Sequence, residues 1–453
     1  MGETVSSTGN LRWPERILRP FAEVRAGEAV TALVLAATIF LVLTAYYLLK
    51  VIREPLILLS GGAEVKAYAA AGQALLLIPV LKAHAAIARR VGRLTLIAII
   101  LLFVACNLLV FAALVRAAVP VGLPFYLWVG TFNYLLVATF WSFANDVYTP
   151  EQGKRLFPIV GVGSSVGALA GAALASALLR RLPPLQLMLC AAALLAVALV
   201  PFAWVNAHQR CRPREGGQEV HPDQPLTGAG GFQALLEDRY LLFIGVIIIL
   251  TNWVTNSGEY VLDKTLVDVA HAGGLGALEA GRFVGQFKAQ YFWWVNVVAV
   301  VGQFFVVSRV LKHVGVGGAL LVLPVIAMAG ATSVVLFPVL AIIRTAKIAE
   351  KGVEYSLETT AVNALYLVVS RDAKYKAKAV IDTLLVRAGD VCAAGTIFVG
   401  THLGLRTHGF AAINVLLAFC WLIAAWKVRA LNLARSGACA PTPVASGSTV
   451  PST

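Results

Sequence analysis

The sequence is poor in charge: Asp, Glu, Lys and Arg make up only 13% of its 453 residues, whereas 59% are hydrophobic. Soluble globular proteins carry about 25% charged and about 45–50% apolar residues. This shortage excludes an ordinary water-soluble enzyme and predicts an all-α integral membrane protein. The net charge of +14 does not point to nucleic acid, because the basic residues lie between apolar runs and form no continuous basic face.

Patterns typical of catalysis and metal binding are also missing. The six cysteines form no C-x-x-C pair, so neither a zinc site nor a disulfide framework is indicated. The histidines show no metal-ligand spacing, no nucleophile–base arrangement stands out, and there is no G-x-x-x-x-G-K-[ST] phosphate loop. The sequence therefore predicts no enzyme, no metal and no cofactor.

Long apolar runs recur along the chain, and a membrane-spanning helix needs about 20 such residues. The tenth run is interrupted by charges, so a surface helix is its alternative interpretation. The first 28 residues hold four arginines and two prolines and do not resemble a signal peptide. The twelve predicted spans lie near 29–50, 67–88, 94–116, 123–145, 157–180, 185–207, 240–262, 289–310, 315–338, 340–369, 379–400 and 407–427.

A polar stretch rich in Pro, Gly and Arg separates the sixth span from the seventh and divides the chain into two six-helix halves. Such a 6+6 layout is typical of the major facilitator fold. The predicted organisation is a cytoplasmic N-terminal segment (1–28), an N-terminal half (29–207), a cytoplasmic linker (208–238), a C-terminal half (239–430) and a disordered tail (431–453).

The distribution of basic residues predicts the orientation. With both termini inside, 23 of the 37 Lys and Arg fall on the cytoplasmic side, 9 on the opposite side and 5 within spans. This asymmetry follows the positive-inside rule. The sequence thus predicts a multi-pass membrane protein with cytoplasmic N- and C-termini.

Charges within apolar runs are the most informative signal, because each costs about 2.5–3.5 kcal/mol at the bilayer centre on insertion scales. Lys50 and Arg53 share one helix face at the end of the first span, next to Glu54. They form either a helix end reaching the membrane surface or an anion-binding pair facing a central cavity. The charges of the second half favour the cavity, and an excess of buried cations suits a phosphate- or carboxylate-bearing cargo.

The second half carries its charges at helical spacing. Arg344 and Lys347 begin a series of basic and acidic residues along the tenth span, where opposite charges can pair. Arg387 and Asp390 lie one turn apart in the eleventh span and are interpreted as a buried pair or a gate. In the seventh span, a polar stripe that includes Asn256 either lines the cavity or bonds to a neighbouring helix.

Three glycines, at 163, 167 and 171, recur every four residues in the fifth span. This spacing places them on one helix face, where small residues let two membrane helices approach closely. Close packing is the favoured interpretation, and contact with a phosphate group is the alternative.

Several segments resemble the ATP/ADP translocases, the nucleotide transporters of plastids and obligate intracellular bacteria. The segments that carry the resemblance are F-W-S-F-A-N-D at 140–146, T-P-E-Q-G-K-R-L-F-P at 149–158, L-L-K-V-I-R-E at 48–54, G-A-E at 62–64, A-K-A-V-I-D at 377–382, and N-x-x-E at Asn256 and Glu259. The chain departs from the family in lacking an acidic residue around 128–131 and a proline-rich run within 355–371.

The resemblance implies a divergent bacterial member with a major-facilitator-like bundle, situated in the inner membrane. It implies substrate roles for Lys50 or Arg53, for Glu259, and for Lys376 or Lys378. Together with the charge pattern, it gives the predicted substrate-binding residues Lys50, Arg53, Asn145, Asn256, Glu259, Arg344, Lys347, Lys378 and Arg387, and the predicted gating or coupling residues Glu54, Asp146, Asp382 and Asp390.

The leading hypothesis is a secondary transporter, acting as a monomer, that exchanges ATP and ADP or moves a related phosphorylated anion by alternating access. The departures from the family leave another anionic cargo open. A second hypothesis is a proton-coupled symporter of a non-nucleotide organic anion. Its predicted proton carriers are the buried carboxylates Glu54, Glu259, Asp382 or Asp390. A third, a non-transporting membrane sensor or scaffold, is disfavoured by the small soluble portion.

Overall fold

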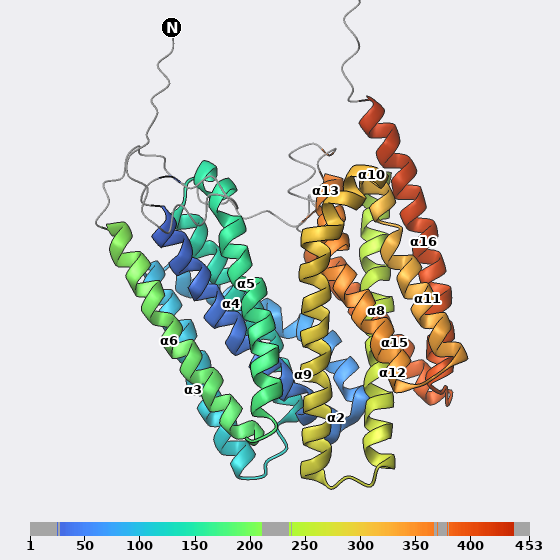
Figure 1. Ribbon diagram of the computed structural model, residues 1–453, viewed down its shortest axis with the longest axis horizontal. Helices are drawn as coiled ribbons and strands as arrows, with labels where there is room; N and C mark the ends of the chain where they lie inside the picture. Colours follow the sequence, from blue (N-terminus) through green and yellow to red (C-terminus); the bar gives the residue numbers. More distant parts are fainter. Residues whose placement is uncertain are drawn as a thin grey trace, which may run out of the picture.

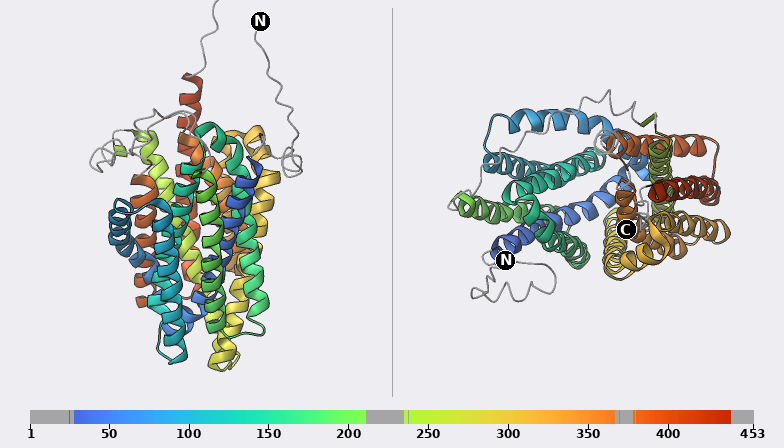
Figure 2. Two further views of the ribbon diagram at one scale, coloured as in Figure 1. Left: turned by 90° about the vertical axis from the view of Figure 1, so that its left-hand side faces the viewer. Right: turned by 90° about the horizontal axis from the view of Figure 1, so that it is seen from above.

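The structure is a computed structural model that describes Arg25 and residues 28–210, 235, 236, 238–366, 369, 378 and 380–438. These residues form helices and their connections, and no strand occurs among them. Two groups of helices stand side by side in Figure 1, α3–α6 with the start of α2 on the left and α8–α16 on the right. Helix α2 runs from the left group toward the right one. Figure 2 shows the same two groups from the side and from above.

The first group opens with the longest helix of the described chain. α2 covers two predicted spans in one element that turns at Gly62, whose φ of 77° is left-handed and favours glycine. The helices of this group are α2 (Ala29–Ala88), α3 (Arg93–Arg116), α4 (Gly122–Val147), α5 (Pro150–Leu178) and α6 (Pro184–Arg210).

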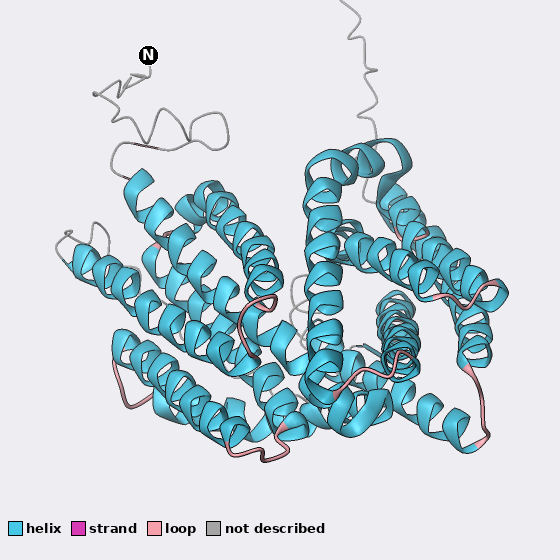
Figure 3. Cartoon of the chain, turned by 60° about the horizontal axis from the view of Figure 1, so that its bottom comes forward, coloured by secondary structure: helices cyan, strands magenta, loops and turns pink. Residues whose placement is uncertain are grey.

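The second group is interrupted by three π-helical segments, labelled η. Gly315, with a φ of 72°, bends α10 as Gly62 bends α2. The elements are α8 (Arg239–Ala272), α9 (Ala277–Val301), η1 (Gly302–Val306), α10 (Val307–Ala319), α11 (Val322–Leu336), α12 (Leu340–Val353), η2 (Glu354–Glu358), α13 (Thr359–Leu365), η4 (Ile381–Leu385), α15 (Val386–His402) and α16 (Thr407–Ala438). Helices dominate every part of the described chain (Figure 3).

The helices agree with the predicted membrane architecture. Within the described residues, nine helices are long and apolar enough to cross a membrane, and α2 counts once although it covers two predicted spans. The short apolar helix α11 and the charged α12 occupy the ninth and tenth ranges. The all-α membrane fold is thus confirmed, while the count of twelve crossings stays a prediction.

The predicted domain boundaries are only partly covered. Most of the N-terminal segment 1–28 and of the linker 208–238 lies outside the described residues, as does the tail after 438. Helix α16 runs through 431–438, a stretch predicted as disordered. The reason is a tertiary contact: the Arg435 guanidinium donates two hydrogen bonds to Asp238, with N–O distances of 3.1 and 2.6 Å.

Two carboxylates just outside the spans anchor helix ends in this way. Burial opposes ionisation of Asp238, but its hydrogen bonds from Arg435 lower its pKa overall. Glu28 precedes α2, and Arg155 of α5 donates to both of its oxygens at 3.0 Å. Burial again opposes ionisation, and the Arg155 contacts again leave the Glu28 pKa below its ordinary value. Both anchors are therefore charged at neutral pH.

The glycine face of α5 is a packing seam against α2, which confirms the favoured interpretation. A Cβ added to Gly163 would lie 2.2 Å from the Ala36 carbonyl oxygen, and one added to Gly167 would lie 2.6 Å from that of Phe40. The Thr44 hydroxyl donates a hydrogen bond of 3.2 Å to the Gly167 carbonyl across the seam. The two backbones are in direct contact along this seam.

A methyl group in this seam is expected to destabilise the protein. In Gly163→Ala the new Cβ meets backbone atoms that cannot rotate away, and overpacking of this kind costs about 1–3 kcal/mol. Gly161→Ala is the matched control, since nothing lies within 4 Å of its added Cβ. Thermal unfolding in detergent should show a lower Tm for Gly163→Ala alone; equal Tm values for the two variants would contradict the seam.

Candidate functional site

A central cavity of about 330 Å³ lies between the two groups of helices. Its wall is rich in charged and aromatic side chains, which is unusual for the interior of a membrane protein. The polar, charged and aromatic residues lining it are Tyr46, Lys50, Arg53, Lys66, Gln73, Tyr126, Tyr134, Asn252, Asn256, Glu259, Tyr260, Asp263, Tyr291, Phe292, Lys351, Glu354, Tyr355, Arg387 and Asp390.

Lys50 and Arg53 of α2 face this cavity, as the anion-pair interpretation predicts. The Lys50 ammonium lies 4.3 Å from the ring centroid of Phe292 and 5.0 Å from that of Tyr47. The Arg53 guanidinium lies 4.5 Å from the Tyr126 ring and 3.4 Å from a Glu54 oxygen. Among the described residues, Lys50 forms no ion pair. Its positive charge is therefore available to an anion.

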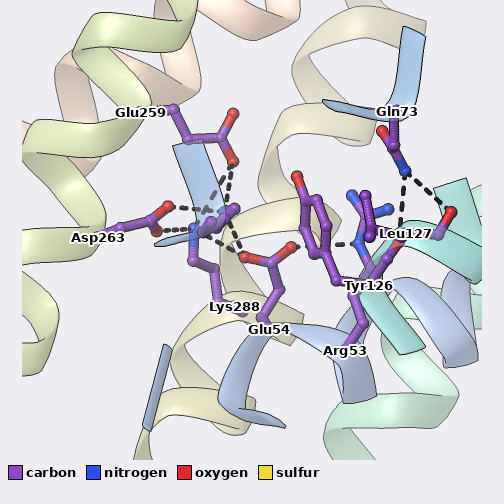
Figure 4. A network of polar contacts seen from close by, with 9 residues as sticks. Arg53, Glu54, Gln73, Tyr126, Leu127, Glu259, Asp263 and Lys288 are labelled. Atoms are coloured by element: carbon purple, nitrogen blue, oxygen red, sulfur yellow. Dashed lines mark hydrogen bonds and ion pairs between the residues drawn. The ribbon is translucent and has the colours of Figure 1, made fainter. Parts of the chain in front are cut away.

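Part of the cavity wall belongs to a buried ionic network that we call the floor cluster (Figure 4). The Lys66 ammonium lies 2.5 Å from Glu54, 2.6 Å from Asp263 and 3.4 Å from Glu259. Lys288, which is fully buried, pairs with Asp263 and lies 3.5 Å from Glu54 and 3.7 Å from Glu259. The members of the floor cluster are Glu54 and Lys66 from α2, Glu259 and Asp263 from α8, and Lys288 from α9.

The floor cluster joins the two groups of helices. Its charges are nearly balanced, and with Arg53 beside Glu54 there are three cations for three carboxylates. The three carboxylates approach one another within 4.8 Å, but the ammonium groups of Lys66 and Lys288 neutralise them. These residues suit a lysine-filled ion network rather than a metal site.

Lys66, Glu259 and Asp263 of the floor cluster line the cavity, and their ion pairs hold the two groups of helices together. The turn of α2 and the α8–α9 connection lie at the end of the molecule opposite to the start of α2 and the end of α16 (Figure 1). Next to the turn of α2, Glu64 accepts a hydrogen bond of 2.7 Å from Lys264 and one of 2.8 Å from the Tyr260 hydroxyl. A Cβ on Gly285 of α9 would lie 3.0 Å from Leu179 of α5. Contacts between the groups thus extend beyond the cluster itself.

The polar stripe of α8 and the charged pair of α15 form the opposite wall. Asn256 donates a hydrogen bond of 2.7 Å to Asp390, which also accepts one of 2.9 Å from Arg387. The Arg387 guanidinium lies 5.2 Å from the ring of Tyr134 on α4. Asn256 therefore both lines the cavity and bonds to a neighbouring helix, so the two interpretations hold together.

Most charges of the tenth span point inward, which favours a helix that lines the interior over the surface-helix alternative. Lys347 is buried and donates to Glu350 at 2.6 Å and to the Thr255 carbonyl at 3.0 Å. It lines a separate cavity of about 30 Å³, whereas Lys351 and Glu354 line the central one. Arg344 is half-buried and lies against the Phe287 ring at 5.1 Å, outside the central cavity.

Four more predicted residues lie away from the cavity. Asn145 and Asp146 are exposed at the end of α4, whose connection to α5 is built by the family-like segment around them. Lys378 donates a hydrogen bond of 2.6 Å to Asn363 and lies 3.8 Å from Asp382, whose side chain is 51% exposed. Lys376 lies outside the described residues. None of the four described residues lines the cavity that Lys50 faces.

The sequence prediction missed Lys66, Asp263 and Lys288. Each lies one residue beyond a predicted span, where the apolar run ends but the helix continues: α8 reaches Ala272 and α9 begins at Ala277. Charged residues directly next to a predicted span should therefore also be considered as candidate site residues, although hydropathy places them outside the helix.

A model of the TLC ATP/ADP transporter family matches residues 125–350 of the chain. The chain is a divergent member of this family. It is 24% identical over 350 residues to ADP,ATP carrier protein 1 of Chlamydia pneumoniae, a match covering 67% of this chain and 66% of that protein. The protein of the same name from Chlamydia trachomatis is 24% identical over 352 residues, covering 68% and 64%.

The TLC family member spans about two-thirds of the length of these relatives, 64–66%. The family is one of transporters, which agrees with the prediction that the chain is not an enzyme.

Solved structures share the fold. An auto-inhibited peptide transporter of the POT family superposes with a TM-score of 0.61 at 14% identity, covering 90% of this chain and 97% of that one. The nucleoside transporter NupG gives a TM-score of 0.59 at 14% identity, covering 88% and 98%. At such low identity these likenesses show the fold alone, and they confirm the predicted major-facilitator-like architecture.

Removing one member of the floor cluster should destabilise the protein strongly. In Asp263→Asn, Lys66 and Lys288 lose a shared carboxylate inside a buried network, and breaking such a pair costs about 3–5 kcal/mol. Glu64→Gln is the control, because its pair with Lys264 is partly exposed and such pairs contribute about 0–1 kcal/mol. Thermal unfolding in detergent measures both; an equal effect of the two changes would count against the cluster.

Proposed function

We propose that the chain is a secondary transporter that exchanges ATP and ADP, or moves a related phosphorylated anion, by alternating access. The observation that carries this proposal is the Lys50 ammonium, which faces the central cavity without a carboxylate partner among the described residues. Every other cation of the wall has an acidic neighbour within 4 Å. A bound anion would complete the charge of the site.

The cavity also suits the rest of a nucleotide. Its volume falls within the range of about 300–1,000 Å³ usual for small-molecule sites. Tyr46, Tyr126, Tyr291 and Phe292 line it close to Lys50 and Arg53, and such rings present flat faces to a nucleobase. The names of the Chlamydia relatives, ADP,ATP carrier protein, support a nucleotide as the cargo. The proposal therefore includes ATP binding.

Alternating access would work by rocking the two groups of helices about the central cavity. In this scheme the floor cluster closes one end of the cavity, and its ion pairs between α2 and α8 must separate when that end opens. With cytoplasmic termini, as the positive-inside asymmetry predicts, the cavity here belongs to an inward-facing state. The proposed setting is a bacterial inner membrane, with the protein as a monomer and without a nucleic-acid partner.

The competing hypothesis of a proton-coupled symporter is weakened, because its predicted proton-carrying carboxylates are paired or lie away from the cavity. Glu54 and Glu259 are held by lysines of the floor cluster, and Asp390 is held by Arg387. Asp382 has a half-exposed side chain away from the cavity. None of these four offers an unpaired, buried carboxyl group in the conformation described.

Neutralising Lys50 should abolish most nucleotide exchange. A charge-assisted hydrogen bond contributes about 1.5–3 kcal/mol, so Lys50→Gln should lower uptake about 10- to 100-fold. Lys50→Arg should restore part of it. The assay is uptake of labelled ATP into liposomes with and without ADP inside, and Lys312→Gln, at an exposed position on α10, serves as the control.

Two results would reject the assignment. Uptake by Lys50→Gln at the wild-type rate would remove Lys50 from the cargo site. No ADP-dependent uptake by correctly folded wild-type protein would exclude nucleotide exchange, and other anions under an imposed pH gradient would then be tested.

A further inference from the structure

Glu358 is a buried acidic residue that has no role in the proposed nucleotide site. It is the last residue of the π-helix η2, and only 4% of it is exposed. Both of its carboxylate oxygens are buried without a hydrogen-bond partner among the described residues. This distinguishes Glu358 from Glu350 of the same span, which is similarly buried but pairs with Lys347 at 2.6 Å.

Within the part of the chain that the structure describes, the elements packed against η2 bring no hydrogen-bonded cation to Glu358. These elements are α9, η1 and α10, besides α12 and α13 on either side. η1 (G-Q-F-F-V) contains no titratable residue, and Lys288 of α9 is held in the floor cluster. The remaining titratable groups of α9 are Glu279 and Arg282 in its first turns and the buried Tyr291, and those of α10 are Arg309, Lys312 and His313, all three exposed.

On its own span, the charged neighbour that acts on Glu358 is Glu354, of the same sign. Glu354 begins η2, four residues before Glu358, and lines the central cavity. It is paired with Lys351 at 3.0 Å. Lys351 and Glu354 thus line the cavity, whereas Glu358 is not among its lining residues.

An ionised carboxylate without a partner is costly in a protein interior, and a second carboxylate nearby raises that cost. Binding a proton would make Glu358 neutral and remove this cost. Intramembrane acids of this kind serve as proton-binding groups in pumps and transporters, and π-helical turns occur frequently at functional sites. The cavity-lining Glu354 supplies a neighbouring acceptor through which the proton can reach water in the cavity.

We propose that Glu358 is a proton-binding site whose proton exchanges with the central cavity through Glu354, so that the transport cycle is linked to proton movement. When Lys351 turns from Glu354 toward an anionic cargo, Glu354 loses its counter-ion and becomes a better proton acceptor. The O–H bond of Glu358 then breaks as one forms on Glu354, and the two carboxyl groups share one proton. This inference adds proton coupling to the proposed transport and places it on residues outside the predicted carriers.

The first test needs no cargo. Infrared spectra of the purified full-length protein at neutral pH should contain the carbonyl-stretch band of a protonated carboxylic acid, and Glu358→Gln should remove it. Glu358→Asp should keep a protonated acid, and Glu350→Gln is the matched control because Glu350 is ion-paired. Identical bands in wild type and Glu358→Gln would overturn the proposal.

The second test measures coupling in liposomes loaded with ADP. The ratio of labelled-ATP uptake rates with and without an imposed pH gradient should differ from one in wild type and return to one in Glu358→Gln. An unchanged ratio in the variant would overturn the coupling. If wild type transports no nucleotide but the infrared band depends on Glu358, the nucleotide assignment fails while the proton site stands, so the two failures are distinguishable.

Discussion

The rest of the structure depends on the ion pairs of the floor cluster that join α2 to α8. Lys66 contacts carboxylates on its own helix and on the other group of helices, and Lys288 reinforces both contacts from α9. An ion that loses its partner in a protein interior is costly, so removing one member of the cluster leaves the others uncompensated. The cluster holds the two groups of helices together and thereby defines which face of each helix the cargo meets.

The cavity wall separates two kinds of positive charge. Lys66, Lys351 and Arg387 are each satisfied by carboxylates, and these pairs hold helices in place. Lys50 rests only against aromatic rings, which shield it without neutralising it. A site built this way can bind an anion and release it again, because binding one phosphate group does not require dismantling the framework.

The sequence predicted the fold class and much of the cavity, because Lys50, Arg53 and Arg387 interrupt apolar runs where charge is expensive. It placed Asn145 and Asp146 in the site by family likeness, yet they lie at the α4–α5 connection, where Arg155 of the neighbouring family-like segment anchors Glu28. Lys66 and Lys288 were missed because hydropathy marks the end of an apolar run and not the end of a helix. The π-helix at Glu354–Glu358 has i→i+5 backbone hydrogen bonds in place of the i→i+4 bonds of an α-helix. Amino-acid composition does not reveal this difference.

Helix α2 carries both the unpaired Lys50 and, beyond the turn at Gly62, the cluster residue Lys66. The cation that faces the cavity and the floor cluster are thus joined through one helical element, which turns at Gly62 between them. Adding one helical residue between Glu54 and Lys66 would rotate the rest of α2 by about 100° about the helix axis. This rotation would separate the Lys66 ammonium from the Glu54 carboxylate. The length of this segment is therefore under a stricter constraint than its composition.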